Sequence, residues 1–126
     1  MPDLLDSFLD TTLAAERFHH AQHVEVAWRF VCRYGMPAAL AEFPAAIKRF
    51  AGAKGAHGLY HETITWAFVL LIAERQAAHP CDSWESFATA NPDLLVWKPS
   101  ILERYYSKEL LASDLARRAF VMPDLI

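Results

Sequence analysis

The chain has 126 residues, six of them histidine, and a formal net charge of −3 at neutral pH. Apolar residues make up 54% and charged residues 21%, a balance that excludes a disordered chain and allows one domain, residues 1–126, with its own core. No general basic field is present, so we expect no nucleic-acid partner.

We expect a cytoplasmic protein with no membrane partner. The longest apolar stretch, 64–73, is broken only by Thr65 and is too short to span a bilayer. The acidic start, residues 1–3, does not have the basic region of a signal peptide. Cys32 and Cys81 form no Cys-x-x-Cys motif, and two such cysteines fit a reducing compartment.

Apolar residues recur at helical spacing through the first half of the chain. Short and long helices are predicted over about 4–10 and about 18–34. A third helix is predicted to begin at Pro37, and Pro44 inside it is expected to kink or split it. The segment 52–58 contains three of the four glycines and is predicted to be a loop.

The helix predicted over about 59–78 has apolar residues in every direction around its axis, which is typical of a helix buried in a bundle. Turns at 80–83 and 91–93 enclose a further short helix. Short C-terminal helices are predicted after Pro99, Ser107 and Ser113. The predicted fold class is therefore all-α: a compact, mostly antiparallel helical bundle around a buried central helix.

Three histidines, His19, His20 and His23, stand in the first turns of the second predicted helix. His19 and His23 are four residues apart and His20 and His23 three, so either pair can direct two imidazoles to one spot. The spacing leaves open whether His19 or His20 takes part. His57 and His79 lie in predicted loops, and we expect them to face water.

A second polar group stands where the central helix begins, at Tyr60, His61, Glu62 and Thr65. Side chains this close to a buried helix are expected to be partly buried, and buried polar groups need hydrogen-bond partners. If the two helix starts meet at one end of the bundle, the histidines and the carboxylate share one site.

Two chemistries are open for such a site. As a metal site, His20, His23, His61 and Glu62 would supply the nitrogens and the carboxylate that bind zinc, iron or manganese. Without a metal, His20 or His61 would transfer protons, Glu62 would orient the imidazole, and Tyr60 would orient water or substrate.

Two tryptophans are candidates for the walls of the pocket. Trp28 follows His23 by five residues, and Trp66 follows His61 by five. With Thr65 they are predicted to line the pocket and exclude water. Ordinary core packing of both indoles is the alternative.

The two polar groups resemble a family of small uncharacterised bacterial proteins. The pattern reads Phe-His-His-x-x-His-x-x-x-Ala-Trp over 18–28 and Tyr-His-Glu-Thr-Ile-Thr over 60–65, and the similarity extends from about Phe18 to Leu125. The resemblance implies a bacterial source and an enzyme-like polar site. It brings no established activity with it.

These observations predict a bacterial cytoplasmic protein with a buried His/Glu/Tyr pocket. It would act on a small molecule as a metal-dependent or acid–base enzyme. The alternative is a non-catalytic helical interaction module, in which an apolar face forms a homodimer and the histidines are structural.

Overall fold

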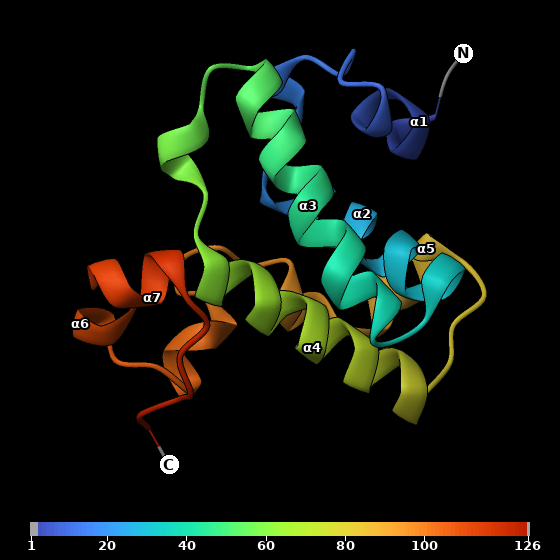
Figure 1. Ribbon diagram of the computed structural model, residues 1–126. Helices are drawn as coiled ribbons and strands as arrows, with labels where there is room; N and C mark the ends of the chain where they lie inside the picture. The colour runs from blue at the N-terminus through green and yellow to red at the C-terminus, as the bar shows by residue number, and fades with distance from the viewer. Residues whose placement is uncertain (1–2, 126) are drawn as a thin grey trace.

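The computed structural model of the protein describes residues 3–125, apart from the side chain of His57 (Figure 1). The described residues form helices that pack against one another and no strand, which confirms the all-α bundle. The α-helices are α1 (Leu4–Leu9), α2 (His20–Tyr34), α3 (Ala38–Ala53), α4 (Glu62–Ala78), α5 (Trp84–Ala90), α6 (Lys108–Leu111) and α7 (Asp114–Arg118). Short 3₁₀ helices are η1 (Ala15–Arg17), η2 (His57–Leu59), η3 (Pro92–Leu94) and η4 (Ile101–Arg104).

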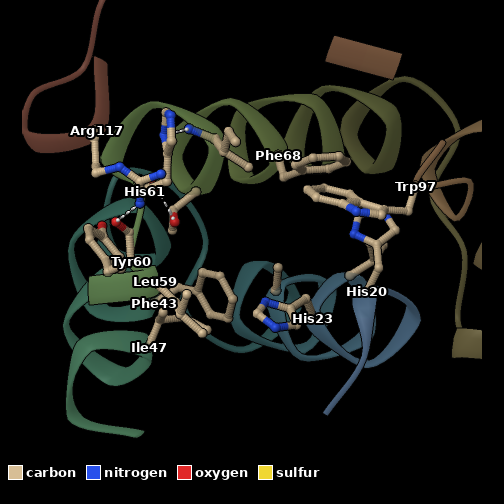
Figure 2. A pocket seen from close by; sticks show the side chains of 14 residues that line it. His20, His23, Phe43, Ile47, Leu59, Tyr60, His61, Phe68, Trp97 and Arg117 are labelled. Atoms are coloured by element: carbon tan, nitrogen blue, oxygen red, sulfur yellow. Dashed lines mark hydrogen bonds between the residues drawn. The ribbon is translucent and has the colours of Figure 1, made fainter. Parts of the chain in front are cut away.

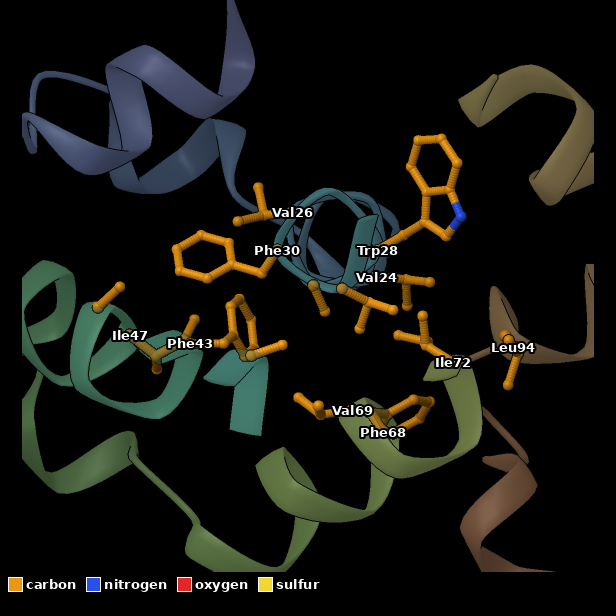
Figure 3. Close-up of a cluster of buried hydrophobic side chains, with 14 of the residues drawn as sticks. Val24, Val26, Trp28, Phe30, Phe43, Ile47, Phe68, Val69, Ile72 and Leu94 are labelled. Carbon is orange, nitrogen blue, oxygen red and sulfur yellow. The ribbon is translucent and has the colours of Figure 1, made fainter. Parts of the chain in front are cut away.

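The core lies between α2, α3 and α4, each of which contacts the other two. Figure 3 shows α2 end on, with Val26 and Phe30 turned toward one side and Val24 toward α4. Val69 and Ile72 of α4 are fully buried in this cluster. The side chain of Leu70, between them, is 39% exposed, so the protein's own chain covers α4 on most sides and leaves one side open.

Side chains next to the helix starts explain where several helices begin. The Asp3 carboxylate accepts a hydrogen bond of 2.8 Å from the Asp6 amide at the start of α1. Ser83, Ser107 and Ser113 accept amide hydrogen bonds in the same way at the starts of α5, α6 and α7. These three serines therefore cap the short helices.

The third helix is longer and more regular than the sequence suggests. It runs unbroken through Pro44 and ends at Ala53, so the proline does not split it and Gly52 is helical. Pro44 is buried together with Phe43 and Ile47 in a helix that packs on both α2 and α4. That packing keeps both halves in one helix although the proline nitrogen donates no hydrogen bond.

The central helix begins at Glu62, three residues later than expected, because His61 caps it. Residues 57–59 form η2 instead, and the His61 Nδ1 accepts a hydrogen bond of 3.1 Å from the Ile64 amide. This bond satisfies one of the amides that a helix start leaves without a partner.

The start of α4 is tied to the C-terminal part of the chain. Thr63 is fully buried, and its hydroxyl donates to the Ala119 carbonyl at 2.9 Å and accepts from the Val121 amide at 3.2 Å. The His61 Nε2 donates to the Leu111 carbonyl at 2.7 Å. These bonds hold α6 and α7 against the first turn of α4, as Figure 1 shows in orange and red.

Thr63→Val should therefore destabilise the fold. The change keeps the volume and leaves the Ala119 carbonyl and Val121 amide without their partner, a loss of about 1–3 kcal/mol in the free energy of unfolding. Urea denaturation measures it, with Thr89→Val on the exposed side of α5 as the control, expected to change stability by less than about 0.5 kcal/mol. Equal losses of unfolding free energy in the two variants would contradict a stabilising role of the Thr63 hydrogen bonds.

Candidate functional site

A cavity of about 360 Å³ lies among α2, α3 and α4 and reaches α7 and the segment after η3. Eight of its 14 lining residues are apolar: Val24, Ala27, Phe43, Ile47, Leu59, Ile64, Phe68 and Trp97. The other six are polar: His20, His23, Tyr60, His61, Thr65 and Arg117. The cavity thus combines apolar walls with a few polar groups, the usual composition of a small-molecule site.

The polar groups are distributed along the cavity. Figure 2 shows Arg117 with Tyr60 and His61 at one end, His20 with Trp97 at the other, and His23 between the two ends. The structure therefore brings His20, His23, His61, Tyr60 and Thr65 to one cavity, although they come from two separate parts of the chain.

His20 is held at its end of the cavity by a backbone carbonyl and two aromatic rings. Its Nε2 donates to the Leu94 carbonyl at 2.9 Å, and the centroids of the Phe68 and Trp97 rings each lie 5.0 Å from its own. Desolvation lowers the pKa of His20, although the Leu94 carbonyl acts in the opposite direction. With Nε2 occupied, Nδ1 is the nitrogen that His20 offers as an acceptor.

His23 has both ring nitrogens without a hydrogen-bond partner among the described residues. Its ring stacks on Phe18 at a centroid distance of 4.0 Å, and the residue lines the cavity and is exposed. Desolvation by the surrounding protein, and then the nearby charge of His20, lowers the pKa of His23 to about 4. At neutral pH the ring offers one donor and one acceptor.

His61 uses both ring nitrogens within the protein. Nδ1 accepts from the Ile64 amide and Nε2 donates to the Leu111 carbonyl, while the residue is 8% exposed. His61 therefore caps α4 and holds α6, and it presents only the carbon edge of its ring for contact with a ligand.

Tyr60 donates its hydroxyl hydrogen to the Glu62 carboxylate. The Lys48 Nζ lies 3.9 Å from the Glu62 Oε1 and 4.9 Å from the centre of the Tyr60 ring. Burial, reinforced by the Glu62 carboxylate, raises the pKa of Tyr60 far above its usual range, so the phenol keeps its proton. Glu62 does not itself line the cavity, while Thr65 does and donates to the His61 carbonyl at 2.7 Å.

No three His, Cys, Asp or Glu side chains among the described residues are placed to hold one metal ion together. Of the four predicted ligands, His61 has no free nitrogen, His20 has one engaged by a carbonyl, and Glu62 is bonded to Tyr60. In this arrangement His61 and Glu62 direct their donor atoms to partners within the protein, so the four predicted ligands are not arranged around one shared metal ion.

Trp28 and Trp66 lie outside the lining of the cavity. The Trp28 indole donates to the Gln76 Oε1 at 3.0 Å, and Trp66 stacks on Phe120 at 5.3 Å. Successive residues of a helix point about 100° apart, so the neighbours of both tryptophans, Ala27 and Thr65, face the cavity instead.

The other three histidines of the chain are His19, at the start of α2, and His57 and His79, in segments predicted to be loops. His19 is exposed and caps α2, where its amide donates to the Gln22 side chain at 3.0 Å, so His20 is the one that faces the cavity. His79 is exposed at the end of α4, as expected. The side chain of His57 lies outside the described part of the structure.

Nine of the 14 lining residues were not anticipated from the sequence, and Arg117 and Trp97 are the two among them that come from the C-terminal part of the chain. Arg117 of α7 donates from Nη1 to the carbonyls of Gly58 and Tyr60 at 3.2 and 3.4 Å. Trp97 comes from the segment between η3 and η4 and is 47% exposed at the cavity. No local pattern predicts either, since both reach the site through tertiary packing of the C-terminal helices.

A second hollow, of about 580 Å³, lies on the other side of α4. It is bordered by Leu70, Leu71, Tyr105 and Met122, with Glu74 as its one acidic residue. It contains no histidine and no cluster of polar side chains among its lining residues.

Comparison of the chain with models of known protein families, with curated proteins and with solved structures gives no match.

His61→Ala should lower stability. The change leaves the Ile64 amide and the Leu111 carbonyl unpaired at a buried position, so we expect a loss of about 1–3 kcal/mol in urea denaturation. His79→Ala is the matched control, because His79 is exposed and should change stability by less than about 0.5 kcal/mol. A loss no greater than that of the control would refute the two bonds.

His23 should titrate near pH 4 in the folded protein, against 6.5 for an ordinary histidine. Between these two values the unfolded chain binds more protons, so this histidine makes stability fall as the pH is lowered from about 6.5 to about 4. His23→Gln should flatten the dependence in that window, and His79→Gln should leave it unchanged. NMR titration of the imidazole resonances measures the pKa directly, and a value near 6.5 would contradict the expectation.

Proposed function

We propose that the protein binds a small organic molecule in the cavity between α2, α3 and α4, through protein groups alone. The observation that carries the proposal is the cavity itself. Its volume of about 360 Å³ falls in the range of small-molecule sites, and His20, His23, Tyr60 and Arg117 line it together with apolar walls.

The chemistry of His23, Tyr60 and His61 supports binding over proton transfer, and His20 keeps Nδ1 as a hydrogen-bond acceptor. A general base works best when its pKa lies near the working pH. The pKa of His23 is about 4, Tyr60 keeps its proton, and both nitrogens of His61 are occupied. These groups are suited to hold a molecule by hydrogen bonds at neutral pH.

The apolar walls and the polar groups of the cavity indicate the chemistry of a ligand that would fit. Phe43 and Ile47 of α3 and Phe68 of α4 offer apolar surface in the cavity, and burial of a hydrocarbon body there stabilises the complex by about 25 cal/mol for each Å² removed from water. His23 would hydrogen-bond a neutral group on the ligand. Leu59 and Trp97, both exposed, border the opening through which the ligand would pass.

Binding of the neutral fluorophore N-phenylnaphthylamine tests the proposal. Ile64→Trp fills part of the cavity and should weaken binding at least fivefold. The matched control is Leu71→Trp, because Leu71 lies two turns further along α4, is also half-buried, and borders the second hollow instead. It should leave the affinity unchanged, and circular dichroism confirms that both variants are folded.

The opposite pattern would overturn the proposal. If Leu71→Trp weakens binding and Ile64→Trp does not, the second hollow is the binding site. If the protein takes up no fluorophore and self-associates in light scattering, the helical interaction module is the better description.

A further inference from the structure

Arg117 is the one permanently charged residue among the 14 that line the cavity, and no carboxylate of residues 3–125 lines it. No carboxylate oxygen of the described residues lies within 4.0 Å of its guanidinium. Four other arginines do have such partners: Arg29, Arg75, Arg104 and Arg118. The positive charge at this end of the cavity is thus not neutralised by direct contact with an acid.

The guanidinium is positioned by its neighbours and keeps donors to spare. Its Nη1 is fixed by the carbonyls of Gly58 and Tyr60. Its Nη2 and Nε have no hydrogen-bond partner among the described residues. The planar fork of an arginine matches a carboxylate better than a lysine does, since it can donate two parallel hydrogen bonds.

The other charges near this end leave the charge of Arg117 uncancelled. Lys48 and Glu62 lie 3.9 Å apart and balance each other behind Tyr60. The histidines that line the cavity have nitrogens bonded to the backbone or open to the cavity, and none of them faces a carboxylate. The end formed by Tyr60, His61 and Arg117 therefore favours an anion (Figure 2).

We infer that the cavity selects monoanionic aromatic acids, whose carboxylate binds Arg117 while the flat apolar body lies against Phe43, Ile47 and Phe68. One guanidinium balances one negative charge, and the flanking rings give a planar body favourable contacts. This inference rests on the proposed function and adds the charge and shape of the ligand to it.

Calorimetric binding of three naphthalenes with different side groups tests it. Naphthaleneacetate is an anion, naphthaleneethanol is neutral and naphthylethylamine is a cation. The acetate should bind about tenfold more tightly than the alcohol, which corresponds to one charge-assisted hydrogen bond, and the amine should bind most weakly.

Two variants assign the preference to Arg117. Arg117→Gln should weaken binding of the acetate to the level of the alcohol and leave the alcohol unchanged, which also shows that the variant is folded. Arg118→Gln is the control, because Arg118 is exposed like Arg117 but pairs with Asp114 and does not line the cavity. It should change neither affinity.

Each contrary outcome has a distinct meaning. If the alcohol binds as tightly as the acetate, or if Arg118→Gln has the same effect as Arg117→Gln, the selection of anions by Arg117 is refuted and the binding cavity stands. If the fluorophore and all three naphthalenes fail to bind, the proposed function fails and the anion preference fails with it.

Discussion

The hydrogen bonds between the first turn of α4 and the C-terminal part of the chain are the constraint on which the candidate site depends. His61 and Thr63 together bind the backbone at Leu111, Ala119 and Val121. They fix α7 beside η2, and only in that position can Arg117 reach the carbonyls of Gly58 and Tyr60. His61 and Thr63 at the start of α4 thereby determine where the guanidinium of Arg117 lies.

The cavity exists because the helices do not close on one another completely at this end of the bundle. Further along, α2 and α4 remain in contact, and Val69 and Ile72 of α4 are fully buried and do not line the cavity. Nearer the start of both helices, histidines take the place of branched apolar residues. Imidazoles that hydrogen-bond to backbone carbonyls cannot fill space as freely as leucines, since their direction is set by the bond.

The helices could be predicted from the sequence where local signals decide them. Apolar periodicity and serine caps depend on neighbouring residues only, so α1, α2 and the short C-terminal helices begin near the expected places. The length of α3 across Pro44 depends on packing, and the late start of α4 depends on a capping side chain. The apolar periodicity of the sequence contains information on neither. In the site, the sequence pointed to His20, His23 and Tyr60, which line the cavity. It could not show that both nitrogens of His61 face the backbone, nor that Arg117 and Trp97 arrive from distant segments.

The origin of Arg117 in α7 also links ligand binding to the folding of the last part of the chain. The cavity is lined by residues from 20 to 117, so it is complete only when nearly the whole chain has folded. A molecule that contacts Arg117 binds the docked form of α6 and α7 and not the detached form. Its binding free energy must therefore slow local opening of that arm, and amide hydrogens from 107 to 121 would exchange with solvent more slowly in the complex.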